Sequence, residues 1–141
     1  MTVLTTSTAR LHRNNAIPYF AKYTMTASTT IFEGAIVAVT STTQAALNAT
    51  DAAGIAVVGI ATMTRTSAAS GTTLIEVMFG HDELLQTNVT MLALVGSPAV
   101  VFDNDVVTSV AGGTNDAKVG VVKEFVSATR SWITILGVAT I

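Results

Sequence analysis

The chain has 141 residues, no cysteine and a formal net charge of −2. Charged residues make up only 11% of it, against about 25% in average soluble domains, while 50% of the residues are hydrophobic. This length favours a single domain, and the lack of cysteine excludes disulfides, thiolate zinc sites and a cysteine nucleophile. The weak negative charge argues against nucleic acid as a partner. A surface with so few charges predicts a homo-oligomer or a subunit packed onto a larger assembly.

Membrane insertion is not expected. The longest apolar runs, 52–61 and 91–96, fall short of the roughly 18–20 residues that a spanning helix needs. Arg10 and Arg13 have no apolar segment behind them, so the sequence does not predict a secretory signal either.

Residues 1–30 form a basic, weakly patterned stretch, since the first acidic residue is Glu33. One interpretation is a solvated terminus, and the other is an arm that becomes ordered by docking on an acidic surface. Three aromatic residues within five positions favour the docking arm, because they are costly to leave in water. The residues expected to carry such docking are Arg10, His12, Arg13, Tyr19, Phe20, Lys22 and Tyr23.

The next part of the chain predicts strands. Residues 34–39 form a short β-rich run, and 40–51 are a connection in which a short helix over 43–48 is possible. Two further runs, 57–65 and 72–80, flank a small glycine-containing break and predict a hairpin. The second of these runs alternates, which places its apolar residues Ile75, Val77 and Phe79 on one buried face.

The C-terminal part repeats this pattern. Strands are expected at 89–95, 99–102 and 106–110, followed by a hairpin formed by 119–126 and 131–137. The spacing from Gly34 to Gly59 is about 25 residues and that from Gly96 to Gly120 about 24, which indicates an internal repeat. The sequence therefore predicts an all-β fold: one β-domain over 31–141 with two similar halves, at about 31–80 and 90–141, preceded by the arm.

Reactive residue types occur without the spacing that chemistry needs. In 81–83, a histidine and two acidic residues are adjacent, and neighbours on an extended chain point to opposite faces, so a polar loop linking the two halves is expected. Residues 103–105 and 112–118 lack the full calcium-loop and phosphate-loop patterns and predict turns. A single strand tryptophan, Trp132, is more typical of a core or an interface than of a sugar platform. No catalytic, cofactor or metal site is expected.

A resemblance adds to this interpretation over roughly residues 31–138. The motifs that carry it are 32–37 (FEGAIV), 52–54 (AAG), 58–61 (VGIA), 68–71 (AASG), 74–77 (LIEV), 106–108 (VVT), 119–122 (VGVV) and 132–135 (WITI). With these motifs the chain resembles the small tailed-phage capsid decoration proteins, also called cement or head decoration proteins.

The resemblance implies a compact β-barrel or tulip-like β-domain, usually trimeric, on the outside of an icosahedral head. There it would clamp neighbouring major capsid subunits, and it would carry no catalytic residues. This chain departs from many relatives in having about thirty residues ahead of Gly34. The expected function is thus a non-enzymatic capsid decoration protein on the outer surface of the virion. The alternative is a receptor- or glycan-binding module on the virion surface, and a small hydrolase ranks third.

Overall fold

The computed structural model of the chain describes residues 3–7, 12–13, 18–70 and 72–137. The expected all-β class is confirmed, since a single 3₁₀ turn, η1 (Val110–Gly112), is the one helical element within these ranges. The strands are β1 (His12–Arg13), β2 (Tyr19–Thr24), β3 (Thr30–Ile31), β4 (Ile36–Thr40), β5 (Ala46–Asn48), β6 (Ile55–Ala61), β7 (Arg65–Thr66), β8 (Leu74–Phe79), β9 (Asp82–Thr87), β10 (Pro98–Val101), β11 (Val106–Ser109), β12 (Lys118–Ser127) and β13 (Arg130–Ile135).

The last five strands close into a barrel, called here the C-terminal barrel. Their order is β9-β11-β10-β12-β13, and pairing of β9 with β13 closes the ring. All pairs are antiparallel except β9 with β11. Closure leaves no unpaired side to the ring, which removes the free edges of an open sheet.

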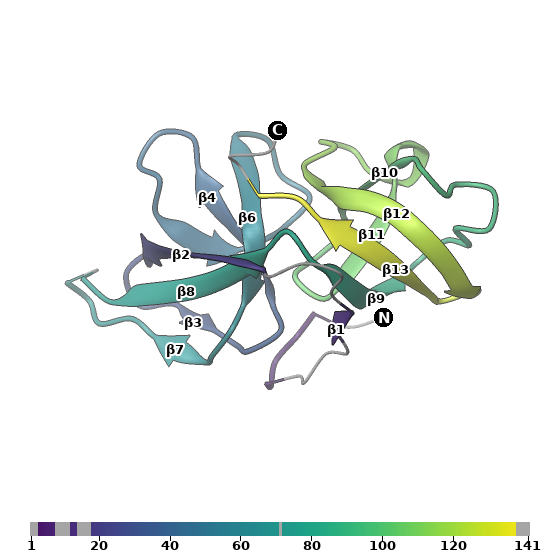
Figure 1. The fold of residues 1–141 in the computed structure, drawn as a ribbon. Coiled ribbons are helices and arrows are strands. Elements are labelled where there is room, and N and C mark those ends of the chain that lie inside the picture. Colours follow the sequence, from purple (N-terminus) through teal and green to yellow (C-terminus); the bar gives the residue numbers. More distant parts are fainter. Residues whose placement is uncertain (1–2, 8–11, 14–17, 71, 138–141) are drawn as a thin grey trace.

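The other large sheet, called here the N-terminal sheet, has the order β2-β8-β6-β4-β5. Directly after β2, Met25 forms a parallel bridge with Ala46 at the start of β5. The short pair of β3 with β7 lies beside this sheet, and Figure 1 shows the sheet and the C-terminal barrel side by side as two lobes.

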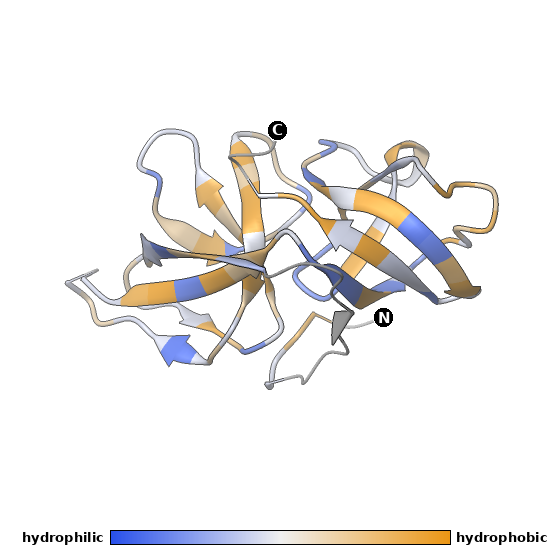
Figure 2. Ribbon diagram, viewed as in Figure 1, coloured by the Kyte–Doolittle hydropathy of each residue, from blue (hydrophilic) through white to orange (hydrophobic). Residues whose placement is uncertain are grey.

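Two apolar clusters lie on opposite faces of β4, which is buried on both faces. Val37 and Val39 pack inside the N-terminal sheet, with Ile75 and Val77 of β8. The opposite side of β4, with Ile36 and Ala38, packs in a second cluster with residues of the C-terminal barrel, among them Leu85, Val107, Val122, Ile133 and Ile135. Figure 2 shows the matching hydrophobic colouring along β4, β6 and β12. The second cluster therefore joins the two lobes through shared apolar packing.

Polar contacts between loops add to this junction. The Asn104 side chain, in the turn between β10 and β11, donates to Asn48 Oδ1 (3.1 Å) and accepts from the Leu4 amide (3.0 Å). The Asp51 carboxylate accepts hydrogen bonds from the amides of Asn115 (2.8 Å) and Thr114 (2.9 Å). These two backbone bonds, Asn115 first, hold the pKa of Asp51 below its ordinary value.

Several expected elements have their predicted form. The hairpin of 119–126 with 131–137 is β12 with β13, and β6 and β8 are antiparallel neighbours. Ile75 and Val77 on β8 are fully buried, as their alternation predicted.

Two of the predicted secondary-structure elements were wrong. Residues 43–48 contain strand β5, since Ala46 and Leu47 pair with Val39 and Ala38. Residues 89–95 do not form a strand: the Leu94 amide donates to the carbonyl of Met91 (3.0 Å), which makes a turn. That segment is apolar because fully buried Met91 packs in the core cluster shared by the two lobes.

Candidate docking surface

Four of the predicted docking residues, Tyr19, Phe20, Lys22 and Tyr23, lie in strand β2 and not in an arm. This strand pairs with β8 in an unbroken antiparallel register from Tyr19↔Phe79 to Thr24↔Leu74. Aromatic residues favour the half-buried surface of a sheet. Here β2 and β8 of the same chain form that surface. Within the stretch 1–30 that was expected to be an arm, 19–24 is therefore a strand, as is 30–31 at its end.

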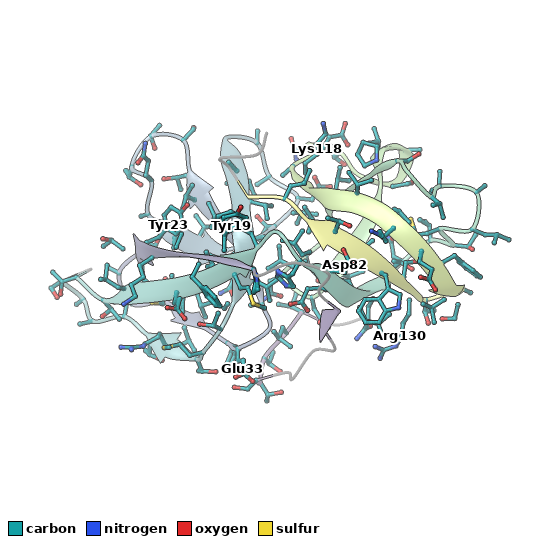
Figure 3. The ribbon with its side chains drawn as sticks, in the orientation of Figure 1. Tyr19, Tyr23, Glu33, Asp82, Lys118 and Arg130 are labelled. Carbon is teal, nitrogen blue, oxygen red and sulfur yellow. The ribbon has the colours of Figure 1, made fainter. Side chains whose placement is uncertain are left out.

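The side chains of β2 alternate between core and solvent. Ala21 and Tyr23 pack against the core of the N-terminal sheet. Tyr19 stacks on Phe79 with ring centroids 5.6 Å apart, yet 64% of it remains exposed. Phe20, 56% exposed, points outward together with Lys22. Tyr19 and Tyr23 are labelled in Figure 3 on the same lobe.

The outward residues of β2 and β8 form a surface, named here the β2 face. It consists of three cross-strand pairs, Phe20 with Met78, Lys22 with Glu76, and Thr24 with Leu74. Apolar pairs thus flank one pair of opposite charges, and β8 in Figure 2 is hydrophobic with one hydrophilic band. Exposed apolar side chains gathered on one sheet face mark a contact surface.

A groove of about 440 Å³ adjoins the β2 face and is lined by Lys22, Met63, Arg65, Thr72, Thr73, Leu74 and Glu76. The Thr62 hydroxyl donates to Glu76 Oε1 (2.9 Å) and holds that carboxylate in place. Among the residues that the structure describes, neither Lys22 nor Arg65 has a carboxylate oxygen within 4.0 Å. The groove therefore offers two cations, one carboxylate and an apolar lining.

The remaining predicted docking residues lie elsewhere. Arg10 is outside the described residues. His12 and Arg13 form β1, whose backbone pairs with β9 so that His12 is opposite Glu83 and Arg13 opposite Asp82. In the strand pairing, acidic positions of the same chain lie opposite His12, Arg13 and Lys22, and docking of these residues on another molecule stays a prediction.

Residues 81–83, expected to be a polar loop, are instead buried at the start of β9. His81 Nε2 lies 2.6 Å from Glu83 Oε1, and both side chains are fully shielded from solvent. Asp82 Oδ1 accepts a hydrogen bond from the Thr134 hydroxyl (2.8 Å). The signal for this pair was present in the sequence, because residues two apart on a strand share a face. Because both side chains are closed off from solvent, the pair cannot contact a substrate, and its contribution is to the stability of the fold.

The other reactive residue types lie in structural positions. Asp103 Oδ1 accepts from the amides of Asp105 and Val106 (2.8 Å each), so 103–105 is a turn held by its own side chain, as predicted. Trp132 is half-buried on β13, across from Leu84 and Glu124. Within the described ranges, no group of three or more histidine, cysteine or acidic residues is arranged to hold a metal ion, and no helix is long and apolar enough to cross a membrane.

Comparison with known proteins adds no relative: no family model matches the chain, and no curated protein matches it. The chemistry of the β2 face is therefore the basis for the functional argument.

Proposed function

We propose that this protein is a structural capsid decoration protein. It would bind the outer surface of an assembled phage head and stabilise contacts between major capsid subunits. The observation that carries the proposal is the β2 face, where Phe20 and Leu74 are about half exposed on either side of the oppositely charged residues Lys22 and Glu76. A surface of this kind binds a macromolecule, and the buried position of His81 and Glu83 leaves no reactive pair open to solvent in that part of the fold.

Exposed apolar residues occur on both lobes, which suits a subunit that bridges neighbours. Besides the β2 face, Leu92 (65% exposed) and Val95 (55%) lie on the loop before β10, and Val126 (48%) lies near the end of β12. A protein that holds adjacent capsid subunits together needs at least two contact surfaces. Because it would bind the assembled lattice but not its dissociated subunits, it would stabilise the head by mass action.

We propose further that the domain consists of two similar halves. When the strands of each set are numbered in chain order, the five strands of the N-terminal sheet and the five of the C-terminal barrel have the same neighbours. In both sets the first strand lies beside the third and the fifth, the second lies between the third and the fourth, and the fourth lies beside the fifth. In each set the second and fourth strands pair with a register shift, next to Gly59 in one and Gly120 in the other. The halves would then be 19–79 and 82–135, instead of 31–80 and 90–141.

The segment before β2 is proposed to act as an arm that lies on its own fold. Leu4 packs against the core of the N-terminal sheet, and the Leu4 amide donates to Asn104 in the other lobe. β1 then pairs with β9 of the C-terminal barrel. An arm in this position would hold the two lobes together, and it would leave the β2 face as the docking surface.

Self-association is part of the proposal, with a trimer favoured by the resemblance to decoration proteins. The scarcity of charge and the exposed apolar residues support it, because such surfaces are usually covered in an assembly. Light scattering of the purified protein at micromolar concentration should give a mass near three times the 14.5 kDa of one chain. A stable species of one chain mass would contradict this expectation.

The functional proposal is tested by cosedimentation of the purified protein with heads that lack it. We expect saturable binding that raises the temperature at which the heads disrupt. A glycan array and a host-cell binding assay test the alternative of a receptor- or glycan-binding module. Binding to a glycan or to cells, with no binding to heads, would overturn the decoration proposal.

A further inference from the structure

Strand β2 has one edge that faces away from β8. The Met25 amide donates to the Thr73 carbonyl (2.8 Å) on the β8 side, whereas the next amide, of Thr26, donates to Ala46 of β5 (2.8 Å) on the other side. Amide and carbonyl groups alternate between the two sides of a strand paired antiparallel. Counting back from Met25, the backbone groups of Tyr23, Ala21 and Tyr19 face β8, and those of Phe20, Lys22 and Thr24 face away from it.

The outward backbone groups of Phe20 and Lys22 form no hydrogen bond with any residue that the structure describes. The parallel bridge of Met25 to Ala46 joins only the Thr24 end of β2 to β5. Over Phe20 to Tyr23, β2 is therefore an open and regular edge, a form that can pair with another strand.

The end of β12, which has a neighbouring strand on one side only, differs from β2. Beyond Val122, β12 has β13 as its one neighbour, but its register shifts twice there, between Val122 and Glu124 and between Phe125 and Ser127. Bulges are a device that prevents pairing at an edge. β2 has neither an irregular register nor proline within it, so its open edge differs from the protected edge of β12.

We propose that an extended segment of the capsid subunit pairs with the free edge of β2 as an added strand, with a carboxylate side chain opposite Lys22 and an apolar side chain opposite Phe20. This inference rests on the proposed function and names the docking site. Across the three strands, the side chains of Glu76, Lys22 and the new carboxylate would then form a row of charges that alternate in sign. Opposite charges on neighbouring strands are favourable. Main-chain bonds would supply affinity and the two side-chain positions specificity.

Charge selects this occupant over a second copy of β2. Two β2 strands paired symmetrically about Lys22 would place two ammonium groups opposite each other, which is destabilising. The Lys22 ammonium has no carboxylate oxygen within 4.0 Å among the described residues, so it can form an ion pair with an acidic side chain of a partner.

Proline at position 24 tests the added strand without changing charge or the aromatic anchor. The Thr24 amide faces away from β8, so Thr24→Pro removes one outward donor and no bond of the β2–β8 ladder. Thr24→Val is the matched control, because it keeps the amide and nearly the same shape. We expect Thr24→Pro to weaken binding to heads about tenfold, and Thr24→Val to leave it within about twofold. Thermal unfolding checks that both variants fold.

Charge reversal is the second test. Lys22→Glu should weaken head binding about tenfold or more, since it sets two carboxylates opposite each other. Lys118→Glu is the control, because Lys118 is an exposed lysine at the start of β12 in the other lobe, labelled in Figure 3, and its reversal changes the net charge equally. Equal weakening by the two variants would assign the effect to overall charge and overturn the proposed site.

A peptide probe separates this inference from the proposed function. An alternating valine–glutamate decapeptide, added to the full-length protein, should slow hydrogen exchange at the amides of Phe20, Lys22 and Thr24, while a valine–lysine decapeptide should not. If the wild type fails to bind heads but the acidic peptide protects these amides, the decoration proposal fails and the strand site stands. Normal binding of heads by both Thr24→Pro and Lys22→Glu, or a lack of protection of these amides by the acidic peptide, would overturn the strand site. The decoration proposal would then be judged separately, from head binding by the wild type.

Discussion

Among single residues, the buried pair of His81 and Glu83 has the clearest energetic role. Their 2.6 Å contact lies fully out of solvent, in a fold with few charges. Removing one member of a buried pair leaves a polar or charged group without its partner, at a cost of about 3–5 kcal/mol. We expect Glu83→Ala to lower the free energy of unfolding by about that amount in urea denaturation.

Glu33→Ala is the control for this prediction, since Glu33 is only half-buried and lies at a turn before β4. Its effect should stay within about 1 kcal/mol. An equal loss for both variants would mean that the contact between His81 and Glu83 contributes nothing specific to stability.

At the scale of elements, two glycines occupy matching positions in β6 and β12. A Cβ atom at Gly59 would lie 2.6 Å from the carbonyl oxygen of Met78, and one at Gly120 would clash with the carbonyl oxygen of Thr134. In both cases the obstacle is the backbone of the neighbouring strand, which cannot rotate away. Glycine is therefore required for close approach of strands in both lobes.

Gly59→Ala and Gly120→Ala should each destabilise the protein by about 2–3 kcal/mol or more, measured by denaturant unfolding. Gly96→Ala is the comparison, because Gly96 has φ +87° but open space around it, so only the backbone cost of about 1–2 kcal/mol applies. A Gly120→Ala variant as stable as the wild type would show that this close approach is absent, and it would weaken the proposal of two similar halves.

Sequence patterns located some elements well and missed others for physical reasons. β8 and β13 were predictable because one face of each is apolar and alternates with more polar residues. β2 was missed because its polar residues and basic flanks are typical of a terminus, and its partner β8 lies some fifty residues away in sequence. β9 was missed because its buried residues include Asp82 and Glu83, and a pattern of hydrophobicity cannot show that their partners lie within the fold.

The docking residues show the same limit. The aromatic cluster Tyr19, Phe20 and Tyr23 stands out in the sequence, but the sequence could not tell which of its members face the core. That division depends on the pairing of β2 with β8, which places Tyr23 against the core and Phe20 in solvent. The groove was not predictable, since Met63 and Arg65 reach it from the connection between β6 and β8.

At the scale of the whole molecule, Asp51 connects the two lobes in a way that depends on pH. Hydrogen bonds from the amides of Asn115 and Thr114 lower the pKa of Asp51 in the folded state below the ordinary 3.8. A lowered pKa means that the ionised form stabilises the fold above the ordinary value, and that this contribution is lost as pH falls through the folded value. The junction should therefore be intact at neutral pH and weaken in acid.

Asp51→Ala removes the same contribution at neutral pH. We expect it to lower Tm relative to the wild type at pH 7, and we expect the difference to shrink as pH falls below about 3.8. Thermal melts of the two proteins between pH 7 and pH 2 measure this. A difference that stays constant over that range would show that the Asp51 carboxylate does not contribute through its charge.

The central claim is that this protein occupies the outside of an assembled head, and electron cryomicroscopy of heads with and without it tests that most directly. The account predicts a difference density on the outer surface, over junctions between major capsid subunits, into which the two-lobed fold of Figure 1 fits with the β2 face against the capsid. Density confined to a tail or fibre tip, or no difference on the head surface at saturating protein, would contradict it.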